Sequence, residues 1–222
     1  NSNIIQFATF ATSGNFADFG DLTAGRSGTS GFSNNTRGVI AGGSDSNNVI
    51  DYITIANTGN ATNFGDLTAA TGDIGGGFSS STRGITAGGY ASNSISNVIQ
   101  YVTIGSTGNA TDFGDLTAGR KFVGGLASAT RGVTFGGELS NGNTTDIIDY
   151  VTIASAGNAS DFGDLSAATN FPAGAASATR GIRAGGTNAN GSGSTNTIDY
   201  ITIGSTGNTQ DFGDLTSSTN ND

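Results

Sequence analysis

The sequence predicts an all-β protein of the β-propeller class, and three observations support this prediction. A stretch of 16 residues recurs five times with fixed internal spacing, which describes one structural unit repeated. No segment shows a helical period, and glycine interrupts every candidate helix. Each full repeat contains four short segments bounded by turn residues. Units of about 45–50 residues with four strands each are typical of propeller blades.

The recurring stretch is clearest at residues 150–165, which read YVTIASAGNASDFGDL. In every copy an aromatic residue precedes an aspartate by 14 positions, and a Gly-Asn pair begins seven residues before that aspartate. Glycine and asparagine both accept the positive φ that tight hairpin loops demand. The five aromatic–aspartate pairs are Phe7/Asp21, Tyr52/Asp66, Tyr101/Asp115, Tyr150/Asp164 and Tyr200/Asp214.

We expect one propeller domain over residues 1–216, followed by a polar tail at 217–222. The domain divides into a half unit at 1–23 and four full units at 24–68, 69–117, 118–166 and 167–216. The half unit contains only the last two of the four segments. Because a propeller ring must close, we expect its first two strands upstream of Asn1 in a longer product.

Within each full unit the four segments are named a to d, as the 24–68 unit illustrates. Segment a (27–33) is small and glycine-rich, and a Thr-Arg-Gly turn leads to segment b (38–43). Segment c (49–55) is β-branched and partly alternating, which makes it the clearest strand. The Thr-Gly-Asn loop then joins segment c to the short Phe-Gly-Asp-Leu-Thr segment d.

The length differences between units fall almost entirely in the b–c loops. The turn arginine precedes the second glycine of segment b by six residues in every full unit, whereas that glycine precedes the strand tyrosine by 9, 12, 13 and 14 residues. In a propeller the b–c loops share one face of the disc, and the a–b and c–d turns share the other. We therefore expect a variable recognition surface on a rigid scaffold, with solvated loops as an equally weighted alternative. The candidate binding residues are Asp45, Asn47, Tyr90, Asn93, Glu138, Asn141, Asn188 and Asn190.

Three sets of residues that recur in the repeats are expected to be structural. The tyrosines are interpreted as core residues between blades, and the turn arginines as structural hydrogen-bond donors. The aspartates have three open roles: accepting backbone N–H groups, pairing with a turn arginine, or holding Ca²⁺ through oxygens such as those of Asp112 and Asp115. The expected structural positions are Tyr52, Tyr101, Tyr150, Tyr200, Arg37, Arg83, Arg131, Arg180, Asp21, Asp66, Asp115, Asp164 and Asp214.

Composition argues against nucleic acid, membrane insertion and most enzyme chemistry. The net charge is −9 and only eight residues are basic, whereas phosphate backbones require clustered Lys and Arg. No apolar run is long enough to span a membrane. The chain has no His and no Cys, which removes Ser/His and Cys/His nucleophilic systems. The repeated Asp-Phe-Gly lacks the other kinase motifs. A glycosidase with two carboxylates is the remaining enzymatic alternative, but most acids occupy repeat positions. We predict no enzymatic activity and no cofactor.

The glycine pairs and tyrosines resemble a kelch repeat. The pairs end segment b at 41–43, 87–89, 135–137 and 184–186, the strand tyrosines follow, and a phenylalanine stands where kelch repeats usually carry tryptophan: Phe64, Phe113, Phe162 and Phe212. The resemblance implies four-stranded propeller blades and covers about 90% of the chain.

The fuller repeat, with VIDY in segment c and TRGV before segment b, is similar to tandem repeats in structural or fibre-like proteins of marine bacteriophages, cyanophages among them. This resemblance implies a virion or extracellular location and attachment to a host surface. The main hypothesis is a propeller that binds a host receptor or glycan through its variable loops. The alternative is a purely structural subunit that contacts copies of itself or other virion proteins.

Overall fold

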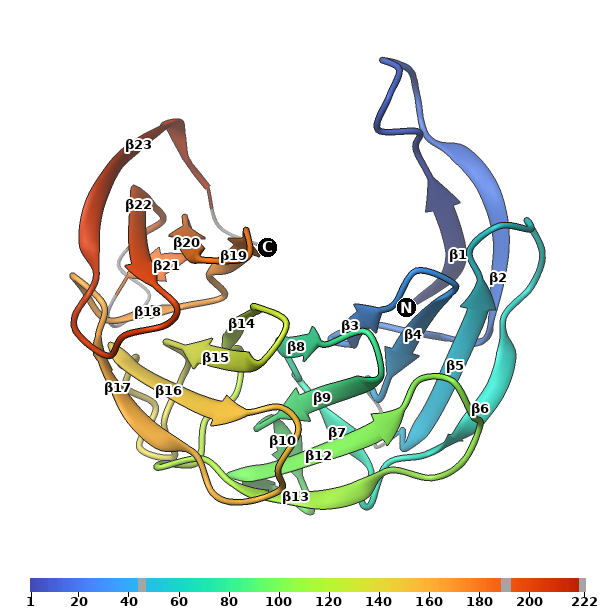
Figure 1. The fold of residues 1–222 in the computed structure, drawn as a ribbon, viewed down its shortest axis with the longest axis horizontal. Coiled ribbons are helices and arrows are strands. Elements are labelled where there is room, and N and C mark those ends of the chain that lie inside the picture. Colours follow the sequence, from blue (N-terminus) through green and yellow to red (C-terminus); the bar gives the residue numbers. More distant parts are fainter. Residues whose placement is uncertain (44–46, 189–192, 220–222) are drawn as a thin grey trace.

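The computed structural model describes residues 1–43, 47–188 and 193–219, and these residues form an all-β protein without helices. Antiparallel sheets stand side by side around a common axis and form an open arc (Figure 1). The N-terminal and C-terminal sheets lie at the two ends of this arc. In the described residues no helix is long and apolar enough to cross a bilayer.

The predicted four-segment pattern is confirmed in all four full units. Each is a four-stranded antiparallel sheet in the order a-b-c-d, and the half unit is a two-stranded sheet of its c and d strands. The half unit contains β1 (Ser2–Phe7) and β2 (Ala17–Arg26), and unit 1 contains β3 (Ser30–Ser33), β4 (Arg37–Ala41), β5 (Val49–Thr54) and β6 (Thr62–Asp66). Unit 2 contains β8 (Gly76–Ser79), β9 (Arg83–Ala87), β12 (Val98–Thr103) and β13 (Thr111–Asp115). Unit 3 contains β14 (Gly124–Ala127), β15 (Arg131–Phe135), β16 (Ile147–Thr152) and β17 (Ser160–Asp164). Unit 4 contains β19 (Ala173–Ala176), β20 (Arg180–Ala184), β22 (Thr195–Thr202) and β23 (Gln210–Thr219).

Two small sheets lie beside the main ones. One pairs β7 (Thr71–Gly72) with β10 (Tyr90–Ala91) and β11 (Ser94–Ile95), and the other pairs β18 (Thr169–Asn170) with β21 (Thr187–Asn188). Residues 217–219 of the expected polar tail continue β23 as a strand.

The Asp-Phe-Gly motif is a β-bulge in strand d. In unit 2, Ile99 pairs with Gly114 but Gln100 pairs with Asp112, so Phe113 is the extra residue on the outer strand. The bulge places Phe113 in the core, where 3% of it is exposed, and its ring packs edge-on against Tyr101 at 5.9 Å. Equivalent register shifts occur in every unit.

Successive units are joined by one repeated set of contacts. In the joint between units 2 and 3, the Gly157 amide donates to the Phe113 carbonyl at 2.6 Å, and the Ala159 amide donates to the Asp115 carbonyl at 2.8 Å. The Asp115 amide donates to Oδ1 of Asn158 at 3.1 Å. A Cβ built on Gly114 would lie 2.5 Å from the carbonyl of Gly157, so only glycine permits this approach. The same contacts occur in the three other joints.

The turn arginines also connect one unit to the next. Arg83 donates from Nη1 to the Ile153 carbonyl at 2.8 Å, and its guanidinium lies 4.2 Å from the centroid of the Tyr101 ring. Arg37 and Arg131 donate in the same way, to Ile104 and Ile203. The structural role expected of these arginines is therefore observed in the three units that are followed by another.

The hydrophobic core is divided into clusters that cross the joints. Phe78, Ile85 and Ile99 of unit 2 pack with Val151 and Ile153 of unit 3. Equivalent clusters join units 1 and 2 and units 3 and 4. Each sheet is too thin to bury both faces alone, so its stability depends on the neighbouring sheet.

Three buried arginine–aspartate pairs lie inside the units. They join Arg26 to Asp51 at 2.9 Å, Arg120 to Asp149 at 2.6 Å and Arg183 to Asp199 at 2.6 Å. Burial lowers the pKa of the Arg120 guanidinium, and the charge and hydrogen bond of Asp149 oppose this shift. The carboxylates also accept hydrogen bonds from Thr23, Thr117 and Ser166 of the preceding units. These pairs therefore connect neighbouring sheets as well as strands of one sheet.

Candidate functional site

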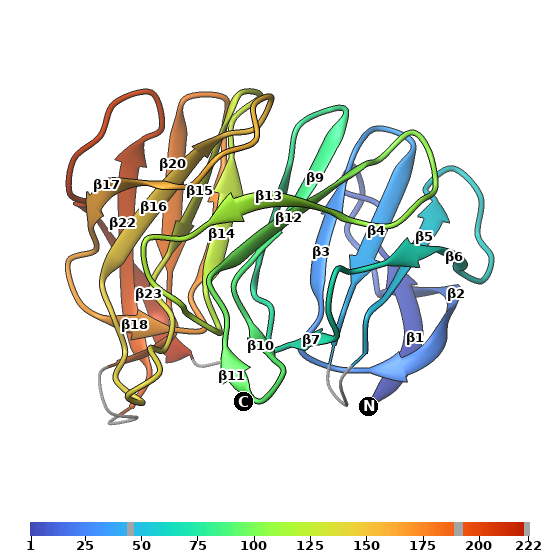
Figure 2. The same ribbon diagram turned by 90° about the horizontal axis from the view of Figure 1, so that it is seen from below.

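The variable b–c loops lie on one face of the arc, as the sequence predicts. β7, β10, β11 and β18 are on this face, and the hairpin turns that join strands a to b and c to d are on the opposite face (Figure 2). Backbone pairing ties the loops of units 2 to 4 to the d–a connections. Tyr90 pairs with Gly72, Glu138 with Lys121 and Thr187 with Asn170. The d–a connections thus fix where each variable loop begins.

The d–a connections contain one position that has a strained backbone and that differs in residue type between the units. The equivalent residues are Gly28, Asp73, Phe122 and Phe171, with φ values of 63°, 54°, 55° and 53°. The left-handed conformation suits Gly28, but it costs roughly 1–2 kcal/mol at a residue with a side chain, and strain of this kind clusters at functional sites. Three of the four units thus accept strain that a glycine would avoid.

Hydrogen bonds link these connections across units. The Ile74 amide donates to the Gly28 carbonyl at 3.2 Å, the Phe122 amide to the Asp73 carbonyl at 3.0 Å, and the Phe171 amide to the Phe122 carbonyl at 3.0 Å. The rings of Phe122 and Phe171 stack with their centroids 4.0 Å apart and their planes at 28°. The backbone therefore fixes the positions of the three side chains, those of Asp73, Phe122 and Phe171.

These connections surround a cavity of about 360 Å³. Because residues of all four full units line it, it lies where the units converge. Its wall combines the Phe122 and Phe171 rings with Pro172, the Asp73 side chain and Thr29. An apolar surface with a few convergent polar groups is the usual composition of a small-ligand site, and the volume lies in the usual range.

A charged cluster borders the aromatic wall. The Lys121 ammonium lies 3.3 Å from a carboxylate oxygen of Glu138, 4.5 Å from the Phe122 ring centroid and 5.8 Å from the Tyr90 ring centroid. The cation therefore connects two of the predicted binding residues, Tyr90 and Glu138, to the cavity wall. Lys121 was not among the residues that the sequence singled out, although it is the one lysine of the chain.

The other candidate binding residues lie apart from this cluster. Asn93, with φ of 63°, forms the β10–β11 turn, and Asn141 accepts the Asn143 amide in its own loop. Asn47 accepts the Val49 amide, and the Asn188 amide donates to the Gly193 carbonyl. Asp45 and Asn190 lie outside the described residues. The sequence thus predicted the face on which the variable loops lie but did not single out Phe122, Phe171 and Asp73, whose signal was a side chain at a position where unit 1 carries glycine.

The second large cavity, of about 430 Å³, lies between the a–b turns on the opposite face. Its polar atoms serve the repeated turns: Ser80 accepts the Arg83 amide, Ser128 the Arg131 amide and Ser177 the Arg180 amide. Their equivalent in unit 1, Asn34, accepts the Arg37 amide. Since turn formation accounts for these groups, the axial cavity on the variable-loop face is the stronger candidate.

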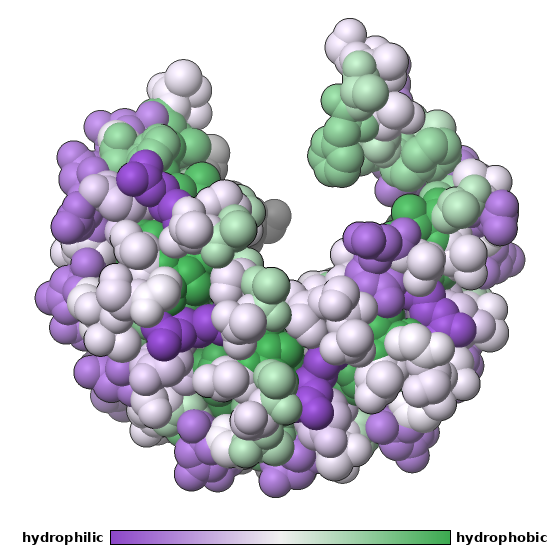
Figure 3. All heavy atoms as spheres, in the orientation of Figure 1, coloured by the Kyte–Doolittle hydropathy of each residue, from purple (hydrophilic) through white to green (hydrophobic). Residues whose placement is uncertain are grey.

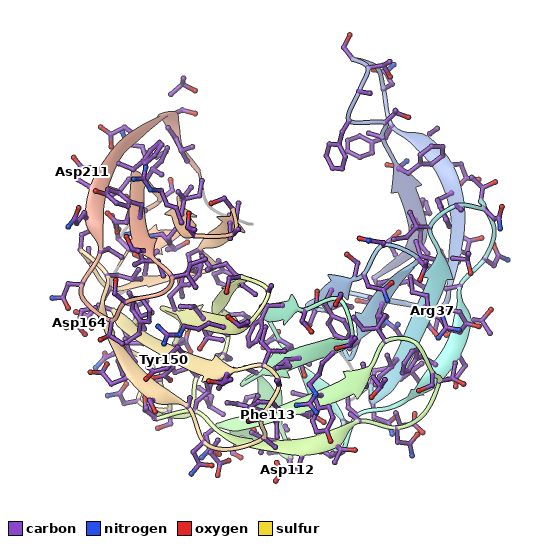
Figure 4. All side chains as sticks on the ribbon, in the orientation of Figure 1. Arg37, Asp112, Phe113, Tyr150, Asp164 and Asp211 are labelled. Carbon is purple, nitrogen blue, oxygen red and sulfur yellow. The ribbon has the colours of Figure 1, made fainter. Side chains whose placement is uncertain are left out.

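The aspartates of the repeat have a role different from the three that the sequence left open. In Asp21, Asp66, Asp115 and Asp164 the backbone amide and carbonyl make the joint contacts described above. No ion pair with a turn arginine occurs among the described residues. Asp112, Asp164 and Asp211 lie spread along the outer rim (Figure 4). In the part of the chain that the structure describes, no three acidic side chains gather in an arrangement suited to a metal ion.

The fold resembles that of a solved structure. No family model and no curated protein matches the sequence. A solved structure of the protein YjhT superposes with a TM-score of 0.73 over 88% of this chain and 68% of that chain, at 10% sequence identity. This likeness concerns the fold alone.

Proposed function

We propose that the chain is a kelch-like β-propeller without enzymatic activity that binds a glycan at the axial cavity of its variable-loop face. The observation that carries this proposal is the strained Phe122–Phe171 stack beside Asp73 in the cavity wall. The order of strands in each sheet and the superposition with YjhT support the propeller architecture. The phage-like repeat pattern supports a virion or extracellular location and a host-surface ligand.

The composition of the wall suits a sugar. Sugar rings present apolar C–H faces and hydroxyl edges, and the cavity offers aromatic and proline surface together with a carboxylate and a hydroxyl. Tyr90, Glu138 and Lys121 provide further polar contacts around the mouth. Rigid aromatic anchors flanked by adaptable polar loops are typical of recognition surfaces.

The acids near the cavity support binding in place of hydrolysis. Asp73 is the one acid among the residues that line the cavity, and Glu138 is paired with Lys121. Glycosidases require two carboxyl groups on either side of the scissile bond. Because the chain also has no His or Cys, we propose that this site binds its ligand and does not cleave it.

The test is glycan-array and calorimetric binding by the intact chain and by two variants that borrow residues from unit 1. Phe122→Gly installs the residue of Gly28, and we expect it to weaken binding about tenfold or more while changing stability by less than about 1 kcal/mol. The stability change is small because relief of backbone strain offsets the lost ring stacking.

The matched control is Ala129→Asn, which installs the residue of Asn35 beside the opposite cavity. We expect it to leave glycan binding unchanged. If Ala129→Asn lost binding and Phe122→Gly retained it, the ligand would bind at the cavity between the a–b turns, and the axial cavity would be rejected as the site. Absence of any glycan ligand for the unmodified chain would reject the proposal.

A further inference from the structure

The Asp73 carboxylate has no cation of its own in the axial cavity. Asp73 lines the cavity and is half-buried, and in the described residues neither an ion pair nor a hydrogen bond reaches its side chain. By contrast, the buried Asp51, Asp149 and Asp199 each pair with an arginine. A carboxylate in a concave site attracts a cation more strongly than one on an open surface, because less water separates the two charges.

The position of this carboxylate follows from the row of strained residues. Its Oδ1 atom lies 3.3 Å from the point where a Cβ on Gly28 would stand, so it occupies space that a side chain in unit 1 would require. The Asp73 carbonyl accepts the Phe122 amide at 3.0 Å, which places the Phe122–Phe171 stack next along the row. The cavity thus has a carboxylate at one end of an aromatic surface.

The lysine of the chain shows that this aromatic surface attracts a cation. The Lys121 ammonium lies 4.5 Å from the Phe122 ring centroid, a distance at which the face of an aromatic ring attracts positive charge. Glu138, 3.3 Å away, compensates the charge of Lys121 and is its one ion-pair partner among the described residues. The charge of Asp73 is therefore left for a cation from outside the chain.

Lys121 is also the one basic residue on the variable-loop face. Three of the eight basic residues are the arginines buried against aspartates inside the units. Four more begin the b strands at the a–b turns, on the opposite face, where Figure 3 shows strongly hydrophilic residues spaced along the arc. Asp73, Glu138 and Asp146, which directly precedes β16, give the variable-loop face a negative charge. A field of one sign draws ligands of the opposite sign toward a cleft.

We propose that the glycan bound in the axial cavity carries a free ammonium group, as amino sugars without an N-acyl group do, and that Asp73 binds this ammonium. The inference rests on the proposed function and adds the charge of the ligand to it. An ammonium offers three donors, and hydrogen bonds between charged groups are about twice as strong as neutral ones. The C–H face of the same sugar packs against the Phe122–Phe171 stack.

The same carboxylate discriminates against other glycans. N-acetylation replaces the ammonium with a neutral amide, which has a single N–H donor and no charge for Asp73. A sugar with a carboxylate group brings a second negative charge, which Asp73 repels. The expected order of affinity is therefore amino sugars first, neutral sugars second and acidic sugars last.

The test compares two ligands that differ in charge and share ring, linkage and length: an oligomer of glucosamine and the same oligomer of N-acetylglucosamine. At about pH 6 primary amines are protonated. By calorimetry under these conditions we expect the intact chain to bind the glucosamine oligomer about tenfold more tightly. Added salt should reduce this preference, because it screens the pair of charges.

Asp73→Asn removes the charge and retains the size of the side chain. Asparagine tolerates the left-handed backbone of this position, so we expect the variant to fold, and thermal unfolding checks this. It should bind both oligomers with an affinity close to that of the intact chain for the N-acetylated one. Asp146→Asn is the matched control, because it removes a carboxylate of the same face that does not line the cavity. We expect it to retain the tenfold preference.

The outcomes separate this inference from the proposed function. A preference that survives Asp73→Asn, or one that Asp146→Asn abolishes equally, would overturn the contact with Asp73. If only glycans without an ammonium group bound, with an affinity that Phe122→Gly lowers and Asp73→Asn leaves unchanged, the proposed function would stand and this inference would be rejected. A chain that binds no glycan at all would reject both.

Discussion

The Arg120 guanidinium donates to the Asp149 carboxylate at 2.6 Å, and both side chains are fully buried. Thr117, from the end of the preceding unit, donates its hydroxyl to the same carboxylate at 2.6 Å. One carboxylate thus ties an arginine of its own unit to a threonine of the neighbouring unit. Removal of the cation would leave a buried charge without compensation.

The buried arginine and the buried aspartate occur together in units 1, 3 and 4, and both are absent from unit 2. Units 1 and 3 place the arginine before strand a, at Arg26 and Arg120, and unit 4 instead places Arg183 on strand b. Unit 2 has no such arginine, and Gln100 replaces the aspartate. Gln100 still accepts the Thr68 hydroxyl and amide, each at 2.8 Å. The link between units is therefore retained in all four, and the charge is introduced only where an arginine neutralises it.

Arg120→Met is expected to lower the free energy of unfolding by about 3–5 kcal/mol, because it leaves the Asp149 carboxylate buried without its cation. Adding Asp149→Gln should recover most of this loss, since unit 2 already uses glutamine there. Urea unfolding of the single and double variants measures both effects. A double variant as unstable as the single one would show that the arginine acts through packing.

Gln100→Asp should lower stability by about 3 kcal/mol at neutral pH, because unit 2 supplies no buried arginine. A buried carboxyl without a cation has a raised pKa in the folded state. Its protonated form is favoured, so the loss is small at acid pH and grows as pH rises through the interval between the unfolded and folded pKa. Unfolding at several pH values checks this sign. A loss independent of pH would contradict the explanation.

Arg83→Gln should cost about 2 kcal/mol, because Arg83 donates to the Ile153 carbonyl of the next unit and lies over the Tyr101 ring. Arg180→Gln is the matched control. Arg180 lies 4.6 Å from the Tyr200 ring centroid but has no carbonyl acceptor in the described chain. We expect about 0.5 kcal/mol for it. Equal losses would argue against the hydrogen bond between units.

Gly114→Ala is expected to cost about 2–3 kcal/mol more than Gly213→Ala. Both glycines have positive φ, 145° and 138°, so backbone strain is similar. A Cβ at Gly114 would lie 2.5 Å from the Gly157 carbonyl, whereas Gly213 has open space around it. The difference in thermal stability therefore reports the close approach between units, and similar losses would mean that strain alone requires the glycine.

The arrangement of strands was predictable because each unit repeats the same local signals. Gly-Asn turns, the β-branched segment at 49–55 and the fixed six-residue spacing after each turn arginine are local in sequence, and β2, β5 and their equivalents follow from them. The face that carries the variable loops followed from strand order alone. For the same reason, Tyr90 and Glu138 were predicted to lie in the variable loops, and the structure pairs both with the d–a connections.

The axial cavity was not predictable from these signals. Phe122 and Phe171 are 49 positions apart in sequence, and the replacement of a glycine at this position acquires a meaning only when its φ and its neighbour are known. Likewise the aspartate of the repeat appeared to act through its carboxylate, whereas its backbone makes the joint. Only the packing of one unit against the next determines which atoms of a repeated residue are used.

The sequence by itself thus determined the repeat, the four-stranded sheets and the separation of constant turns from variable loops, because these depend on short-range propensity and period. Tertiary structure alone decided the joint between units, the buried charge pairs and the strained cavity wall. These features arise where segments remote in sequence meet, and there burial and close approach give each side chain its role.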